Sequence, residues 1–175
     1  MVISSAEKAI LLMVSDLLEA LKYPTPSLDP DFIRGVVSGN HFWALEWKLD
    51  CLSDGSPKPP ELVEVLGIMD AWRILKFSFE KADIGRFLFE TKRTEIPVFE
   101  GFDANNEGRH LSIARFLVNE LDRYPELKDA VVNSHSPLLA YYAPIVDAVI
   151  SIKADLLHGT FTTDQLIAIF KRQDQ

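Results

Sequence analysis

The chain has 175 residues, of which 47% are hydrophobic and 10% aromatic, and its formal net charge is −8 at pH 7. This length and apolar content exclude a disordered protein or a linker and predict one folded domain over residues 1–175. An acidic chain is repelled by phosphate backbones and by anionic lipids, so nonspecific binding to nucleic acid is not expected.

Cysteine use and hydropathy predict a cytoplasmic protein without a membrane segment. Cys51 is the single cysteine, and a free thiol suits a reducing compartment, where it is expected to act as a small buried hydrophobe. The apolar run at 10–14 has acidic neighbours and lacks a cleavage site, which argues against a signal peptide. The longest apolar stretch, 137–157, carries charged residues and cannot span a membrane.

The first predicted helix begins at Ser4, because Ser4 and Glu7 have the spacing of a capping box. Apolar residues then recur every three or four positions, and they are expected to form one stripe against the core until Pro24 ends the helix. The stripe consists of Ala6, Ala9, Ile10, Met13, Leu17 and Leu21.

Caps and chain breakers predict the elements that follow. Asp29 and Pro30 form a cap and a first helical position, and Gly39 ends that helix. Asn40 is expected to cap the next one. The predicted order is a helix from Pro30 to Gly39, a helix over 41–52, a loop over 53–60 and a central helix over 61–81 that is apolar on nearly every side.

The second half is also expected to be helical, except that the helical pattern is lost over 87–95 and that 96–99 is extended, because Pro97 disfavours helix before it. Caps and proline positions predict a helix over 104–121 after Asp103, a helix over 137–157 interrupted by Pro144, and a last helix opened by the capping box at 162–165. Seven helices without alternating strands predict an all-α single-domain bundle with no significant sheet.

One segment combines glycine, acidic, arginine and aromatic residues in a specific order: Gly101, Phe102, Asp103, Ala104, Glu107, Arg109, Leu111, Arg115, Phe116, Val118, Asn119, Arg123 and Tyr124. This segment resembles the core of the YfbU-like family of bacterial proteins of uncharacterised function. The resemblance implies a helical bacterial cytoplasmic protein that can self-associate, and it implies no catalytic residues.

Four residues of this segment form a candidate polar site: Asp103, Glu107, Arg115 and Asn119. Asp103 is expected to cap the helix, and Glu107 to lie in its first turn. Arg115 and Asn119 lie one turn apart at the edge of the buried arc, where an arginine usually pairs with a carboxylate. Binding of an anion there is the alternative.

A candidate interface comes from the two apolar stripes predicted for 41–52, of which Phe42 begins one and Trp43 and Trp47 belong to the other. One stripe can face the core, so the other is expected to contact a further helix of the domain or a second subunit. Side chains on the far side of the 104–121 helix are solvated or face a partner. The candidate interface comprises Trp43, Trp47, Arg109, Phe116 and Arg123.

Three chemical motifs are weak. Glu107 and His110 have the spacing found in helical di-iron sites, and Asp155 and His158 repeat it. Such a site also needs glutamates from two further helices, which the sequence does not supply. His110 is therefore expected to be a hydrogen-bonded core residue. The serines and histidine at 133–137 resemble a loop and a helix cap more than a catalytic triad. No metal and no cofactor are therefore expected.

No residue pattern fixes a reaction. The leading hypothesis is a non-enzymatic protein that forms a homo-oligomer and acts as a binding or regulatory module for a protein partner. One alternative is a small-ligand-binding protein or an enzyme built around Glu107, Arg115 and Asn119. The other is a DNA-associated regulator that uses 31–49 as a helix-turn-helix, although its second helix is aromatic rather than basic.

Overall fold

The computed structural model describes residues 3–22, 29–52, 55–153 and 159–171. Its α-helices are α1 (Ser5–Ala20), α2 (Pro30–Gly39), α3 (Trp43–Lys48), α4 (Pro60–Phe79), α5 (Ile84–Thr91), α6 (Gly108–Asn119), α7 (Leu139–Lys153) and α8 (Thr163–Lys171), with short 3-10 helices η1 (Asp50–Leu52) and η2 (Pro125–Ala130). Over these ranges the β-type pairing is an isolated parallel bridge between Phe102 and Asn133, and no sheet forms. The predicted all-α fold class is confirmed.

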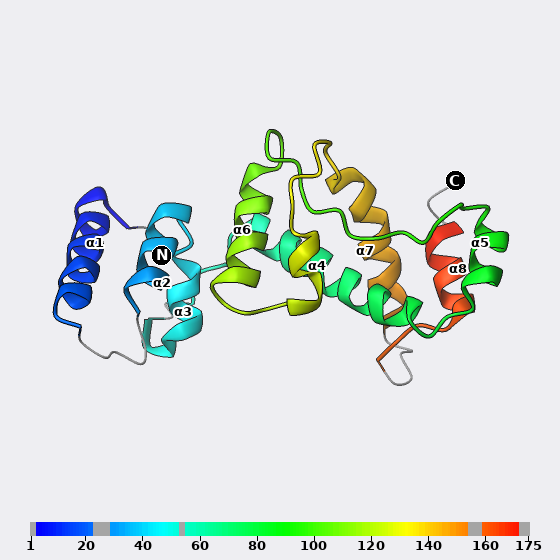
Figure 1. Ribbon diagram of the computed structural model, residues 1–175, viewed down its shortest axis with the longest axis horizontal. Coiled ribbons are helices and arrows are strands. Elements are labelled where there is room, and N and C mark those ends of the chain that lie inside the picture. Colours follow the sequence, from blue (N-terminus) through cyan, green and yellow to red (C-terminus); the bar gives the residue numbers. More distant parts are fainter. Residues whose placement is uncertain (1–2, 23–28, 53–54, 154–158, 172–175) are drawn as a thin grey trace.

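Helix α4 lies at the centre, as its apolar pattern predicts. Its buried residues are Leu62, Val65, Ile68, Met69, Ala71, Trp72, Leu75, Ser78 and Phe79. Helices α6, α7 and α8 pack on it, and the Trp72 ring lies edge-on to Tyr142 of α7 with the ring centroids 5.7 Å apart. Figure 1 shows α4 running from beside α6, in the middle of the molecule, toward the end that holds α5 and α8.

Capping residues predict the starts of three helices correctly. The Glu7 carboxylate accepts from the Ser4 N–H at 2.8 Å, and the Ser4 hydroxyl accepts from the Glu7 N–H at 3.3 Å. The box at 162–165 makes the same reciprocal pair of bonds before α8. The Asp29 carboxylate accepts from the Phe32 N–H at 2.9 Å at the start of α2. Each start is set by side chains within four residues of one another.

The third predicted helix is shorter than expected. It consists of α3 and η1, and Asn40 does not cap it. Asn40 is instead the left-handed residue that ends α2, with φ 56°, and its side-chain oxygen accepts from the Lys8 ammonium. Cys51, expected to be buried, is exposed on η1.

The apolar stripe predicted to face the core on α1 faces outward instead. Ile10, Met13, Leu17 and Leu21 are exposed, and α1 packs on α2 through its other side, where Leu11 and Leu18 are half-buried. The orientation of α1 is set by ion pairs, as the Arg34 guanidinium of α2 binds two carboxylates of α1, Asp16 at 2.9 Å and Glu19 at 2.5 Å.

Helix α5 is absent from the sequence-based prediction. The Asp83 carboxylate caps it by accepting from the Arg86 N–H at 3.0 Å. Its buried residues are Phe87 and Thr91, too few to give a clear apolar period. The Phe87 ring packs between Phe79 and Phe170, with centroids 5.0 and 5.7 Å away. The helix is therefore stabilised mainly by residues distant in the sequence.

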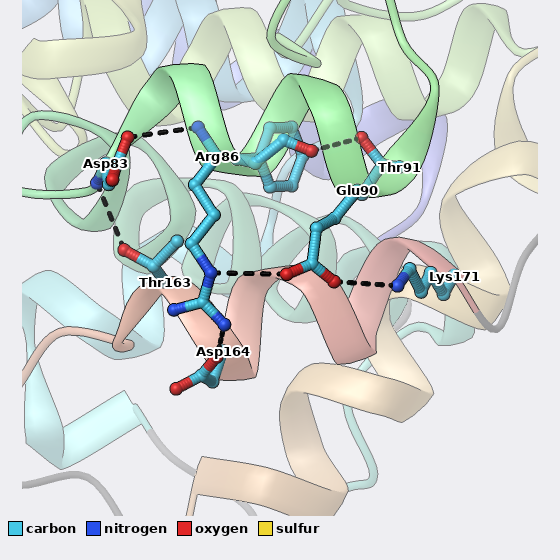
Figure 2. Close-up of polar contacts among 8 residues, drawn as sticks. Asp83, Arg86, Glu90, Thr91, Thr163, Asp164 and Lys171 are labelled. Carbon is cyan, nitrogen blue, oxygen red and sulfur yellow. Dashed lines mark hydrogen bonds and ion pairs between the residues drawn. The ribbon is translucent and has the colours of Figure 1, made fainter.

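Figure 2 shows the polar contacts that join α5 to α8. Arg86 contacts Glu90 on its own helix at 3.2 Å and Asp164 of α8 at 2.5 Å. Glu90 also accepts from the Lys171 ammonium at 3.0 Å, which closes a chain of alternating charges along the seam. These groups are exposed, so the seam orients α5 more than it stabilises the fold.

Candidate functional site

A groove of about 1130 Å³ lies between α3, the loop before α4, the first turn of α6 and the segment that follows α6. Its lining includes four of the five residues of the candidate interface, Trp43, Trp47, Arg109 and Arg123. We call this hollow the cationic groove, because its described lining contains the cations Lys8, Lys58, Arg109 and Arg123 and a single acidic residue, Glu46.

Trp43 forms the buried part of the wall. It is 7% exposed, and its ring packs on Phe116 of α6, with ring centroids 5.9 Å apart. Phe116, expected on the outer side of its helix, is buried and also contacts Phe32 of α2 and His41. Trp43, which begins the second apolar stripe of 41–52, is therefore covered by another helix of the same chain.

Trp47 forms the accessible part of the wall. Its ring is half-buried and lies edge-on to Trp43 at 4.8 Å between centroids. The Lys58 ammonium lies 5.3 Å from the centroid of the Trp47 ring, and the Arg123 guanidinium lies 4.8 Å from it. Both cations are thus held by the π-face of one indole, which fixes their position without neutralising their charge.

The two remaining cations are held by neutral groups. Arg109 donates to the backbone oxygens of Gly39 and Asn40, at 3.0 and 3.3 Å, where the end of α2 is negatively polarised. Lys8 donates to the Asn40 side chain at 3.0 Å. In the part of the chain that the structure describes, none of the four cations of the groove has a carboxylate partner. The groove is therefore a positively charged concavity in an acidic protein.

A second hollow of about 500 Å³ adjoins the first. It shares Trp47, Lys58 and Arg123 with the cationic groove and is otherwise lined by residues that include Arg73 and Tyr124. The Tyr124 hydroxyl donates to Asp70 at 2.8 Å, and Arg73 pairs with Glu126, so these polar groups are already partnered. Trp47 and its two cations thus form a ridge between two hollows.

The candidate polar site is only partly assembled. The buried Glu107 carboxylate accepts hydrogen bonds from three backbone N–H groups, those of Asp103 at 3.0 Å, Leu138 at 2.6 Å and Leu139 at 2.8 Å. It therefore caps the first turn of α7, a role that the sequence had assigned to the segment 133–137, and it ties that helix to the start of α6.

Asp103 caps a turn rather than α6 itself. Its carboxylate accepts from the backbone N–H groups of Asn105 and Asn106 at 3.2 Å, and α6 starts only at Gly108. The side-chain hydrogen bond from Asn106, followed by these backbone bonds, keeps the pKa of Asp103 below its usual range. Asp103 is thus a structural carboxylate that shapes the approach to Glu107.

Arg115 and Asn119 do not join this pair. Both are exposed, and they lie about 12 and 18 Å beyond Glu107 along the axis of α6 at 1.5 Å per residue. Within the described ranges, the Arg115 guanidinium has no hydrogen bond or ion pair, so the expected carboxylate partner is not found. The four residues do not converge on one cavity.

The model of the YfbU domain family matches residues 34–157, which is most of the chain. The chain belongs to the YfbU domain family. Comparison with curated proteins and with solved structures found no significant match. Most of the cationic groove lies within the matched YfbU domain, whereas Lys8 and the rest of α1 precede it.

The histidine of the YfbU domain that sequence spacing linked to a metal is explained by a hydrogen bond. His110 is buried, and its Nε2 lies 2.7 Å from the Glu64 carboxylate, as expected for a core histidine. Among the described residues, no group of three or more His, Cys, Asp or Glu side chains is placed to hold a metal ion. Asp155 and His158 lie outside the described residues.

Over the described residues of the YfbU domain and its flanks, no helix has both the length and the hydropathy that a membrane span requires.

Sequence reasoning missed two cations of the groove, Lys8 and Lys58. Lys8 sits on the side of α1 that faces α2, and Lys58 lies in the proline-rich loop before the YfbU domain's central helix. Neither position follows a period that would point to a neighbour in space. Lys58 between Pro57 and Pro59 does carry one weak signal, because prolines hold a loop residue in an extended conformation.

His41 lies behind the groove wall of the YfbU domain. Burial against Phe116 and Trp43, followed by the nearby Arg109 charge, lowers the pKa of His41 to about 4. The ring is therefore neutral at pH 7, and its Nε2 lies 3.1 Å from the Ser112 hydroxyl. Protonation would place a second cation beside Arg109 in an apolar site.

Acidification should destabilise the protein through His41. With a pKa of about 4 in the folded chain and 6.5 in the unfolded chain, the unfolded state binds the proton more tightly, so stability falls as the pH drops below 6.5. We expect the free energy of unfolding to be about 2 kcal/mol lower at pH 5 than at pH 7.5. Urea denaturation at the two pH values measures this difference.

The matched control is His41→Gln, which keeps a polar partner for Ser112 but cannot titrate. The pH-dependent loss between 7.5 and 5 should shrink by about 2 kcal/mol in this variant. An unchanged loss would assign the effect to other groups.

Proposed function

We propose that this member of the YfbU domain family is a non-catalytic binding module that self-associates and binds an acidic segment of a protein partner in the cationic groove. The observation that carries this proposal is the set of four groove cations without a carboxylate partner among the described residues, two of which, Lys58 and Arg123, lie against the accessible Trp47 ring.

Charge complementarity favours an acidic ligand. The protein as a whole carries a net charge of −8, whereas the groove contains four cations and one acid in its described lining. An acidic segment is therefore repelled by most of the surface and attracted to this part of it. Lys58 and Arg123 are held against Trp47, so little side-chain entropy is lost when carboxylates pair with them.

The size and openness of the site favour a peptide segment over a small molecule. The groove measures about 1130 Å³ and continues past Trp47 into a hollow of about 500 Å³, while small-molecule pockets usually measure about 300–1,000 Å³. Single-stranded nucleic acid also binds cationic, aromatic surfaces. However, a nucleic acid carries a phosphate on every nucleotide and extends this charge over the acidic surface outside the groove, whereas a protein segment can carry its acidic residues in the groove alone, so an acidic protein segment fits better.

Fluorescence anisotropy with a fluorescein-labelled peptide of four Glu-Tyr repeats tests the proposal. We expect saturable binding that weakens as the salt concentration rises from about 50 to 500 mM, because the contacts are ionic. Arg123→Glu should weaken binding at least about tenfold, since it reverses a charge at the ridge. The neutral probe is the same peptide with glutamine in place of glutamate, and it should not bind.

The matched control is Lys128→Glu, the same type of charge reversal at an exposed residue of η2 that does not line the groove. This variant should bind the peptide as the wild type does. Equal losses in both variants, or tighter binding of a thymidine oligonucleotide of the same charge than of the peptide, would overturn the proposal.

A further inference from the structure

Helix α1 has an apolar face that no described part of the chain covers. The large residues of this face are between 46% and 67% exposed, and they are Ile10, Met13, Val14, Leu17 and Leu21. Ala6, Ala9 and Ala20 are exposed as well and complete an uncharged stripe along four turns of the helix. Figure 1 shows α1 at one end of the molecule, beside α2 and away from α4.

The chain cannot bury this face by rotating α1 against α2. The opposite side of α1 carries Asp16 and Glu19, both bound by the Arg34 guanidinium, and Lys8, bound by Asn40. Rotation would break these contacts and would expose Leu11 and Leu18, which are half-buried on the side that faces α2. The apolar stripe is therefore held outward by the same polar contacts that dock α1.

We propose that this stripe binds the same stripe of a second copy of the chain, with the two α1 helices antiparallel about a two-fold axis near Met13 and Val14. This inference rests on the self-associating module proposed above and names its contact surface. Monomers rarely expose contiguous apolar patches of more than a few hundred Å², and a closed two-fold contact covers the stripes of both copies at once.

The sequence of the stripe is self-complementary in one antiparallel register. Residues at equal distances from the proposed axis are Ala6 and Leu21, Ile10 and Leu17, and Met13 and Val14. Small residues near the start of the helix therefore meet large residues near its end, which allows close packing. In a parallel pair, Ala6 would meet Ala6 and Leu21 would meet Leu21, leaving a gap at one end and crowding at the other.

Charge also favours the antiparallel pair. Glu7 lies in the first turn of α1 and Lys22 lies two positions after the last residue of the helix, so an antiparallel arrangement brings opposite charges together at both ends. A parallel arrangement would bring like charges together. The acidic residues of α1, Glu7, Asp16 and Glu19, argue against binding of the stripe to a lipid surface, because helices that lie on membranes are usually basic.

A dimer joined through α1 would carry two cationic grooves. Lys8 contributes to the groove from the side of α1 opposite the stripe, so the two surfaces do not compete. A partner with two acidic segments would then be bound bivalently, which raises its apparent affinity without any new contact.

Sedimentation velocity of the wild type over about 1–100 μM should show a dimer. Met13→Glu/Leu17→Glu should raise the dissociation constant of the dimer at least about 100-fold, because each copy would have to bury two unpaired carboxylates. Both residues are more than half exposed in the single chain, so the variant should fold normally and still bind the acidic peptide in its groove. Circular dichroism and the anisotropy assay check these two points.

The matched control is Phe89→Glu/Ile150→Glu, which makes the same change at two exposed apolar residues on α5 and α7. This variant should remain dimeric. A monomeric wild type at 100 μM would overturn the dimer while leaving peptide binding by the groove intact. Dimerisation that survives Met13→Glu/Leu17→Glu would overturn the role of α1, as would binding of the monomer to neutral lipid vesicles through this stripe.

Cysteine cross-linking tests the direction of the helices. In a Cys51→Ser background, a mixture of the Ala6→Cys and Leu21→Cys proteins should form a mixed disulfide dimer on mild oxidation, whereas neither protein alone should do so. Cross-linking of the Ala6→Cys protein with itself would indicate a parallel pair and would overturn the antiparallel register.

Discussion

Replacing Glu107 with alanine should lower the free energy of unfolding by about 3–5 kcal/mol, because the change leaves buried backbone donors without an acceptor. The Glu107 carboxylate accepts from Asp103 on one side and from Leu138 and Leu139 on the other. No other acceptor for these three N–H groups is found in the described part of the chain. Urea denaturation at pH 7, followed by circular dichroism, measures the loss.

Glu107→Gln separates the geometry of this contact from its charge. The glutamine side chain keeps one carbonyl oxygen as an acceptor but loses the negative charge at the start of α7. We expect it to cost about half as much as alanine. A cost below about 1 kcal/mol for alanine, or identical costs for the two variants, would contradict the capping role.

Gly101→Ala should be the most damaging glycine substitution, with a cost of about 3 kcal/mol or more. Gly101 has a φ of 81°, and a Cβ atom there would lie 2.2 Å from the Val132 backbone oxygen. The segment cannot move away freely, because the Tyr142 hydroxyl donates to the Gly101 oxygen at 3.0 Å and accepts from the Glu100 N–H at 3.1 Å. Thermal and urea unfolding of the variant measure the effect.

Gly159→Ala is the matched control for Gly101. Its φ is 74°, so the backbone penalty is comparable, but no heavy atom of the described residues lies within 4 Å of the new Cβ. We expect a cost of about 1 kcal/mol from the backbone alone. If Gly101→Ala were no more costly than Gly159→Ala, the close approach of Val132 would have no energetic weight.

Features that depend on neighbours in the chain are predictable from the sequence. The capping boxes at Ser4 and Thr162, the Asp29 cap of α2 and the central place of α4 all follow from residues a few positions apart. The core role of His110 was also predictable, since a lone histidine on an apolar helix needs only one polar partner.

Features that depend on competition between distant surfaces were not predictable. A helical wheel identifies an apolar arc on α1, but the side of α1 that docks on α2 is the one whose two carboxylates, Asp16 and Glu19, bind Arg34. Phe116 was expected outside because it lies opposite the apolar arc of its helix, yet the aromatic side chains of α2 and α3 cover it. Helix α5 was missed because its one large buried side chain, Phe87, gains its contacts from α4 and α8.

The linear order of residues thus settles which segments coil into helices and where most of them start, because capping bonds and apolar periods operate within one or two turns. Packing between helices far apart in the chain decides which face of each helix is buried and which N–H groups donate to Glu107. It also brings the four cations together in one groove. The free energies of burial and of charge pairing depend on which groups are close in space, and groups far apart in the chain become close only once the helices have packed together.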